Sequence, residues 1–470
     1  MAESLPIKKK SQYEVANEVL EKIHSEKIEI KIEDMIKGKN CAETLTSSLV
    51  QAFKDNDKFF KFFYKDIIPV GSVPEDLRIG RANEFDFMIV LDLEKLPGFK
   101  VEELIQEDFI VLSVKKPNDP EMIPEWLSPD FSDPFEKYKI AQMYDLSEDE
   151  MIIDPRKCRT WLFQHVFYEI FPTFRKNMQL KGLDVHETVH SYLGMRMSLD
   201  LTVLSKECGA INVDIVLAFS CQIRSLKSEY VPRTFFAIDQ IKKNPELKEL
   251  NNDVLFVPVP PLRYETRGIR TIWNWRLEFA KAESLIINYQ GREPLKKMIR
   301  LMKYFRNKAF WRKLVKSQHL KSVVLDMFKI HPELSWWSDE NLSKNFVECL
   351  DHLQQSLKNG FLPNFFFHER NVFGKNIEDR SDILSLKGRG LLVNIDLETL
   401  KASFEIENEK CEEIWLKSFG EVEKPNDAAS YNAKSEFARL YITCVNTHLT
   451  IESRKMISRE DFHENVDDKE

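Results

Sequence analysis

Three acidic residues on two predicted strands have a spacing that suits the binding of divalent cations. Glu84 and Asp86 lie two residues apart in NEFDFMIVLDL, so on a strand both side chains project from the same face. Asp214 interrupts the apolar strand pattern INVDIVLAF. Two cations held by three carboxylates can activate an attacking hydroxyl and neutralise a leaving pyrophosphate, as in nucleotidyl transfer. On its own, an E-x-D pair is more often only the polar face of a strand.

A short turn before this pair supplies the context for a phosphate site. Gly71 precedes Glu84 by thirteen residues and is followed by Ser72. The backbone N–H groups of such a turn and the serine hydroxyl can hold a triphosphate beside the cations. Gly-Ser is common in turns, but together with E-x-D and a later strand aspartate it forms the pattern of the polymerase-β-like nucleotidyltransferases.

Alternating and helical patterns predict the elements that must position these residues. Apolar residues of one parity between 83 and 93, and again in INVDIVLAF, predict two strands with one buried face. Two amphipathic helices are predicted before them, each opened by a capping-box spacing, near residues 11 and 40. After a proline-rich break the pattern is mainly helical, with the clearest segments at 276–287, 294–306 and 320–330.

Length and net charge limit the classes of protein to which the chain can belong. The chain has 470 residues, enough for two lobes that each bury a core, and its net charge of −8 argues against a surface that is basic throughout. We find no apolar run of the roughly 20 residues that span a membrane and no signal peptide, so we expect a cytoplasmic protein without a membrane partner. The seven scattered cysteines indicate neither a disulfide framework nor a zinc finger.

The segment GSVPEDLRIGRANEFDFMIVLDL resembles cyclic GMP-AMP synthase and the animal cyclic GMP-AMP synthase-like receptors. Further landmarks follow in the same order as in that family: INVDIVLAF, then WRLEF at 275–279, LMKYF at 301–305, SQHLKS at 317–322 and FLPNFFF at 361–367. The resemblance covers roughly residues 40 to 375.

The resemblance implies an α+β fold, bilobal, with a polymerase-β-like nucleotidyltransferase core of mixed sheet and helices and a C-terminal helical lobe. It implies an enzyme that joins ATP and GTP into a cyclic dinucleotide in two successive transfers at one site between the lobes. We accordingly divide the chain into N-terminal helices with a spine-like helix (1–70), the nucleotidyltransferase core (71–225), the helical lobe (226–375) and an extension with an acidic, disordered end (376–470).

The same resemblance implies roles for individual residues. Glu84, Asp86 and Asp214 would hold two Mg²⁺ or Mn²⁺ ions. The residues implied to contact nucleotides are Gly71, Ser72, Thr202, Arg276, Lys303 and Ser317, of which Lys303 and Ser317 would steady phosphates and Arg276 a base. From the residues alone, Lys303 could be a solvated lysine, Arg276 an ion-pair partner and Thr202 an ordinary strand residue.

Two departures from the family pattern bear on the activator and the product. Vertebrate cyclic GMP-AMP synthase carries a zinc-binding His/Cys insertion that engages DNA, but residues 276–303 here contain no Cys and no His. We therefore expect no zinc, and we favour the invertebrate type of receptor, with double-stranded RNA as the activator. Gln318 stands where the family often has an aromatic residue that stacks on a base. A glutamine has no π face for stacking, so the order in which ATP and GTP are used, and with it the linkage of the product, stays open.

A basic segment is the predicted surface for the RNA. Eleven Lys or Arg residues and one Glu lie between positions 291 and 321. Phosphate backbones bind such clusters without base specificity, and double-stranded RNA is recognised mainly through its shape, its phosphates and its 2′-hydroxyls. We expect RNA to dock across this segment and the N-terminal helices and to order the turn at Gly71. Several copies of the protein could also assemble on one RNA. The residues chosen for RNA contact are Lys296, Lys297, Arg300, Arg312 and Lys313.

Two other classes of protein stay open at this stage. A catalytically silent nucleotidyltransferase fold could act as a binding or scaffold protein, although it would have no physical need for three converging carboxylates. An oligoadenylate synthetase-like polymerase would share the core chemistry, but the WRLEF and LMKYF segments favour the cyclase. The preferred function is a sensor in antiviral innate immunity.

Overall fold

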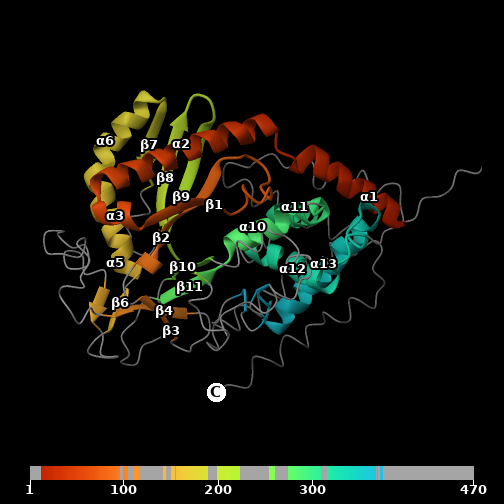
Figure 1. The fold of residues 1–470 in the computed structure, drawn as a ribbon. Helices are drawn as coiled ribbons and strands as arrows, with labels where there is room; N and C mark the ends of the chain where they lie inside the picture. Colours follow the sequence, from red (N-terminus) through yellow and green to blue (C-terminus); the bar gives the residue numbers. More distant parts are fainter. Residues whose placement is uncertain are drawn as a thin grey trace, which may run out of the picture.

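The computed structural model has an α+β fold with two lobes, a core built on a mixed sheet with helices and a C-terminal helical lobe (Figure 1). It describes residues 12–95, 99–103, 109–115, 141–143, 150–153, 155–188, 198–222, 253–259, 274–289, 291–308, 315–366, 368 and 371–373. In this part of the chain, no helix is long and apolar enough to cross a membrane.

The N-terminal helices are divided between the two lobes. Helix α1 (Gln12–Ile23) and the π-helical turn η1 (His24–Ile28) pack on the helical lobe, whereas α2 (Ile32–Asn56) and α3 (Lys58–Phe63) cover the sheet (Figure 1). Asp57 caps α3 by accepting a hydrogen bond from the backbone N–H of Phe60 at 2.6 Å. The break between η1 and α2 therefore separates a helix of one lobe from a helix of the other.

The sheet is mixed and centres on two parallel strands. Strand β2 (Glu84–Asp92) pairs in parallel with the long strand β9 (Gly209–Gln222), and the remaining strands pair antiparallel. Strand β1 (Tyr64–Val70) lies on the other side of β2, while β8 (Ser198–Ser205) and β10 (Asp253–Val259) pair with successive parts of β9. The outer elements are η2 (Leu93–Lys95), β3 (Phe99–Glu103), β4 (Phe109–Lys115), β5 (Ala141–Met143), β6 (Glu150–Ile153), β7 (Leu183–Glu187) and β11 (Asn274–Glu278).

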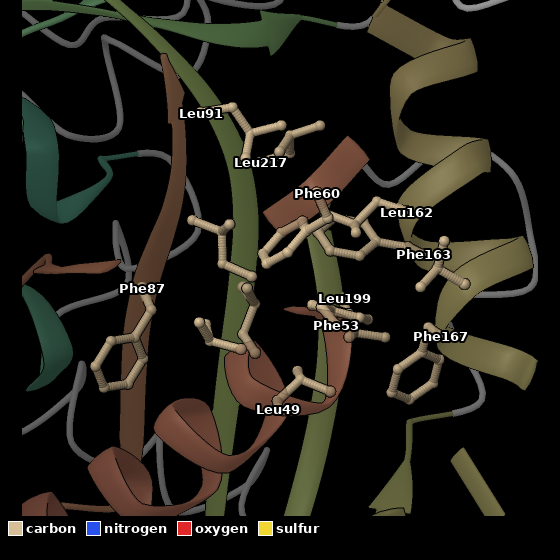
Figure 2. Packing of buried hydrophobic residues seen from close by; sticks show 14 of the residues in the cluster. Leu49, Phe53, Phe60, Phe87, Leu91, Leu162, Phe163, Phe167, Leu199 and Leu217 are labelled. Carbon is tan, nitrogen blue, oxygen red and sulfur yellow. The ribbon is translucent and has the colours of Figure 1, made fainter. Parts of the chain in front are cut away.

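One face of this sheet is buried under helices. Helix α5 (Pro155–Arg159), the π-helical segment η5 (Thr160–Val166) and α6 (Phe167–Leu180) join α2 and α3 on it. Phe87 and Leu91 of β2 belong to the same hydrophobic cluster as side chains of these helices, and Figure 2 shows Phe53 and Phe60 of the helices close to Leu199 of β8. Because the apolar parity of the strands is used for the core, the polar residues of the same strands project from the opposite face.

The helical lobe has a core of its own. It consists of α10 (Ala280–Asn288), α11 (Glu293–Lys308), α12 (Ser317–Ile330), the 3₁₀ turn η10 (Asp339–Asn341) and α13 (Leu342–Asn359). Leu20 of α1 and Leu77, from the loop between β1 and β2, are buried in the same cluster. Two segments from the N-terminal part of the chain thus belong to the C-terminal lobe.

The structure differs from the sequence-based description at three places. Arg276 and the two residues after it were expected in a helix but form β11, and the helix begins only at Ala280. Strands β10 and β11 extend the sheet beyond residue 225, and β1 places sheet structure before residue 71. The predicted extension at 376–470 lies outside the described residues.

Candidate active site

The predicted carboxylates gather on the face of the central strands that points away from the helix-covered core. In the parallel pair β2 and β9, Asp86 lies directly opposite Asp214, and Glu84 lies opposite Asn212. Neighbouring strands are about 4.8 Å apart, so Asp86 and Asp214 are side by side. All four belong to the parity that points away from the helix-covered core, because Phe85, Phe87, Val213 and Ile215 occupy the other parity. The register therefore brings together the three acids that the sequence selected.

Strand β8 adds a carboxylate that the sequence-based selection missed. Asp200 pairs with Asp214, so Asp86, Asp214 and Asp200 form one row across three strands. The Asp200 side chain is buried and accepts a hydrogen bond from the hydroxyl of Ser198. The signal was present in SLDLTVLS, where an aspartate stands between Leu199 and Leu201 just as Asp214 stands between apolar residues. We call Asp86, Asp214 and Asp200 the carboxylate row.

The turn at Gly71 lies against this row. β1 ends at Val70, which is opposite Asp86, and the chain then turns at Gly71 with φ of +78°. A Cβ atom at position 71 would collide with Oδ2 of Asp86. Glycine is therefore required both for the backbone conformation and for the close approach to the carboxylate. This arrangement places the backbone of the turn next to the carboxylates, where a triphosphate would have to bind.

Three side chains of the helical lobe donate hydrogen bonds to backbone carbonyl oxygens of the loop that follows the turn. Nδ2 of Asn288 donates to the carbonyl oxygen of Pro74 at 2.8 Å. Nε of Arg300 donates to the carbonyl oxygen of Asp76 at 2.7 Å, and Nη2 forms an ion pair with Oδ2 of Asp76 at 2.7 Å. Nζ of Lys303 donates to the carbonyl oxygen of Leu77 at 2.6 Å. We call residues 71–77 the clamped loop.

A buried ion cluster adds a further contact between the helical lobe and the clamped loop. Nζ of Lys321 on α12 lies 3.0 Å from Oε1 of Glu75 and also contacts Glu283 of α10. Burial alone would lower the pKa of Lys321, but the two carboxylates outweigh burial and raise it, so the ammonium stays charged. Buried groups of this kind are costly when one partner is missing. The position of the clamped loop therefore depends on residues of α10, α11 and α12.

The electrostatics of the carboxylates suit a cation. Burial, followed by the charge of Glu84, raises the pKa of Asp86 to about 6. Nη1 of Arg78 lies 2.6 Å from Oε2 of Glu84 and is the positive charge that now neutralises this carboxylate. The donors are all carboxylate oxygens, which Mg²⁺ and Mn²⁺ prefer. Within the described ranges, no group of three or more His, Cys, Asp or Glu side chains is arranged closely enough to hold a metal ion.

Two of the predicted nucleotide contacts, Thr202 and Arg276, lie on the same face of the sheet. Thr202 pairs with Asn212, and its hydroxyl donates to Oδ1 of Asn212 at 3.1 Å. Arg276 on β11 pairs with Val257 and forms an ion pair with Glu278 at 2.8 Å. Nε of Arg276 is buried and has no hydrogen-bond partner among the described residues. Such an orphaned donor is what a bound nucleotide could satisfy.

The two predicted phosphate contacts have partners within the protein. Lys303 is buried behind the clamped loop, and burial together with the charges of Arg306 and Arg78 lowers its pKa to about 8. The hydroxyl of Ser317, at the first residue of α12, accepts a hydrogen bond from Nη1 of Arg306 at 2.8 Å. Both residues are thus held in place by the helical lobe.

In the described part of the basic segment, Lys296, Lys297 and Arg300 are engaged in contacts within the protein. Lys296 and Arg300 are largely buried; Lys296 pairs with Glu293 at 2.8 Å, and Arg300 holds the clamped loop. Lys297 lies between Glu21 of α1 and Asp339 of η10, at 2.8 and 2.7 Å. Lys297 and Arg300, both predicted to bind RNA, thus pair with residues far away in the sequence, whereas Lys296 pairs within its own helix. Arg312 and Lys313 lie outside the described residues.

Comparison with known proteins gives two findings. Residues 294–386 match the Mab-21 protein HhH/H2TH-like domain. The chain is 25% identical over 395 residues to a cyclic GMP-AMP synthase-like receptor of Aethina tumida, which covers 83% of this chain and 89% of that protein. A receptor of the same description from Drosophila eugracilis is 22% identical over 76% of this chain and 85% of its own length. Mouse cyclic GMP-AMP synthase is 29% identical over 121 residues, 23% of this chain and 24% of that enzyme.

Proposed function

We propose that this chain, which is similar to cyclic GMP-AMP synthase-like receptors over most of its length, is a member of that family and an active nucleotidyltransferase that makes a cyclic dinucleotide from ATP and GTP. The observation that supports this most directly is the register of β2 and β9, which sets Asp86 beside Asp214 at the turn of Gly71. Nucleotidyl transfer needs acidic ligands and a phosphate-binding turn at the same place.

The metal ligands would be Glu84, Asp86 and Asp214, with two Mg²⁺ or Mn²⁺ ions. When bound, the ions supply an activated hydroxyl and stabilise the charge on the leaving phosphates. Their binding favours the charged form of Asp86, whose raised pKa reflects an uncompensated burial cost. Arg78 contacts Oε2 of Glu84, so Oε1 is the oxygen through which Glu84 would hold an ion while the ion pair is intact.

The nucleotides would lie between the carboxylate face of the sheet and the helical lobe. Backbone N–H groups of Gly71 and Ser72 would hold a triphosphate, with Lys303 and Ser317 on the helical side and Arg276 at a base. The orphaned Nε of Arg276 supports a polar ligand there. We place the reaction in the cytoplasm, where ATP and GTP are available.

Double-stranded RNA is the activator that we propose, in the setting of antiviral innate immunity. Residues 276–303 contain no Cys and no His that could hold the zinc ion of a DNA-binding insertion. Since Lys296, Lys297 and Arg300 are engaged within the protein, RNA contact in the basic segment would fall to Arg312 and Lys313. Double-stranded RNA suits such residues because it is bound largely through its phosphates.

The decisive experiment identifies the product. Purified protein is incubated with ATP, GTP and Mg²⁺ or Mn²⁺, with double-stranded RNA, double-stranded DNA or neither, and products are identified by mass spectrometry. We expect a cyclic dinucleotide in the presence of RNA and its loss in Asp86→Asn. The matched control is Asp92→Asn, on the same face and at the far end of β2, which should keep the activity.

Other outcomes separate the alternatives. Linear oligoadenylate would identify a template-independent polymerase, and no product with either metal and either nucleic acid would leave a binding or scaffold protein. For the activator, Arg312→Glu with Lys313→Glu should raise the RNA concentration needed for half-maximal activity. Lys344→Glu, a reversal on the exposed side of α13, should not. Equal RNA dependence in all three proteins would contradict the proposed contact.

A further inference from the structure

A pair of cysteines lies at the contact between α2 and the sheet, away from the carboxylate row. Cys41 is on α2, and Cys208 is in the turn between β8 and β9, 167 residues later. Their sulfur atoms are 3.0 Å apart. This separation is only about 1 Å longer than a covalent S–S bond, which measures about 2.05 Å.

The geometry points to a modification site: we propose that Cys41 and Cys208 form a reversible internal disulfide when the protein meets a low-molecular-weight disulfide. Both thiols are free in the reduced protein. Among the other described cysteines, Cys158, Cys221 and Cys349 are fully buried. Internal disulfides in reducing compartments are usually transient and redox-sensing.

The difference in solvent exposure indicates which of the two thiols reacts first. Cys208 is partly exposed in its turn, whereas Cys41 is only 8% exposed. Burial, then the neighbouring Cys208, raises the pKa of Cys41 to about 11, so it is the slower thiol to react. Cys208 is therefore the entry point, and Cys41 completes the bond.

The chemistry balances with one disulfide reagent. The Cys208 thiolate attacks a sulfur of RSSR, which forms a mixed disulfide at Cys208 and releases RS⁻. The Cys41 thiol then attacks the Cys208 sulfur, loses its proton and expels the second R group as RSH. Two electrons pass from the two cysteine sulfurs to the reagent, and a dithiol reductant reverses the reaction.

The bond would fix α2 to the strands of the carboxylate row. Asp200 lies on β8 and Asp214 on β9, on either side of the turn that holds Cys208. Cys41 lies in the N-terminal half of α2, and this helix begins just after the break following η1 that separates the two lobes. A cross-link between elements so distant in sequence strongly restricts the unfolded chain, so oxidation should also raise the temperature of unfolding.

The test uses the full chain and glutathione buffers. Reduced protein is equilibrated at increasing ratios of oxidised to reduced glutathione, free thiols are blocked with N-ethylmaleimide, and unreduced digests are analysed by mass spectrometry. Trypsin leaves Cys208 and Cys221 on one peptide, so chymotryptic cleavage after Phe219 is needed to separate them. We expect a Cys41–Cys208 peptide that accumulates with oxidation, disappears with dithiothreitol, and accompanies a rise of about 2 °C or more in the unfolding temperature.

Variants make the outcome unambiguous. Cys208→Ser should abolish both the cross-link and the temperature shift, and Cys41→Ser should leave Cys208 carrying one glutathione. The control Cys221→Ala should keep the cross-link. If Cys41→Ser does not fold, Cys208→Ser decides alone. The proposal is overturned if wild-type Cys41 and Cys208 are both blocked by N-ethylmaleimide at every ratio, if oxidation stops at a mixed disulfide, or if Cys208 pairs with another cysteine.

Discussion

At the level of single residues, Gly71 is the position where the turn after β1 and the carboxylates constrain each other. Gly71→Ala adds a methyl group against Asp86 and places alanine at φ of +78°. We expect the variant to fold but to lose most of its activity, because the turn or the carboxylate must move. Initial rates of dinucleotide formation at saturating ATP and GTP, together with thermal unfolding, measure the two effects separately.

Gly80→Ala is the matched control for this substitution. Gly80 has nearly the same backbone angle, φ of +77°, but a Cβ atom there would meet nothing within 4 Å. Both variants bear the cost of a left-handed alanine, roughly 1–2 kcal/mol, and only Gly71→Ala adds the collision. Equal activity in the two variants would show that the approach of Gly71 to Asp86 does not matter for catalysis.

His319 gives the stability of the helical lobe a defined pH dependence. It is buried on α12, its Nδ1 accepts a hydrogen bond from the backbone N–H of Lys316 at 3.2 Å, and its ring packs on Phe373. Burial, with the charges of Lys316 and Arg306, lowers its pKa to about 4. An unfolded histidine binds a proton below about pH 6.5, so the contribution of His319 to stability is complete above that pH and falls toward pH 4.

The expected loss from this residue between pH 7.5 and pH 5 is about 2 kcal/mol. His319→Gln removes the titrating group, so the stability difference between wild type and variant should shrink over this range. Chemical denaturation of both proteins at the two pH values measures the difference. A difference that stays constant would mean that His319 does not titrate as proposed.

At the level of elements, Lys321 is the centre of the contact between the clamped loop and the helical lobe. Lys321→Met leaves Glu75 and Glu283 buried together without a cation. Breaking a buried ion pair in this way costs about 3–5 kcal/mol, so we expect a large loss of stability and of activity. Glu283→Gln in the Lys321→Met background should recover part of it, because one buried charge is then removed.

The control for this prediction is Lys344→Met. Lys344 pairs with Glu348 on the exposed side of α13, where an ion pair contributes about 0–1 kcal/mol. Chemical denaturation of wild type, Lys321→Met, Glu283→Gln and the double variant gives the coupling energy, and Lys344→Met is measured beside them. If Lys321→Met were no more harmful than Lys344→Met, the buried cluster would not hold the loop.

The same elements show what the sequence could and could not predict. Alternation identified β2 and β9, and therefore Glu84, Asp86 and Asp214, because side-chain direction in a strand follows from position alone. The partners of Arg300 and Lys297 could not be predicted, because Asp76 and Glu21 are separated from them by more than 200 residues. Counting charges along the sequence identified a basic segment. Which of its charges face solvent depends on tertiary contacts, and the count gives no information about those.

At the level of the whole molecule, the two hydrophobic cores divide the N-terminal helices between them. Leu20 of α1 is buried with α11, α12 and α13, and Leu49 of α2 is buried with β2, β9 and α6. Polar contacts reinforce the first attachment, since Nδ2 of Asn17 donates to the carbonyl oxygen of Glu340 at 2.7 Å. Arg300 also contacts both His24 of η1 and Asp76 of the clamped loop. α1 is thus joined to the clamped loop through the helical lobe, and α2 to the carboxylate row through the sheet.

This division predicts which parts of the protein each helix protects. Leu20→Ala and Leu49→Ala remove the same atoms from two fully buried sites, each at a cost of about 2–5 kcal/mol. If the lobes open as separate units, Leu20→Ala should speed amide hydrogen exchange in α11, α12 and α13, and Leu49→Ala in β2, β9 and α6. Hydrogen–deuterium exchange mass spectrometry of both variants measures this pattern. Faster exchange in both lobes of each variant would instead show one cooperative unit, in which any ligand that moves α1 must also loosen the carboxylate row.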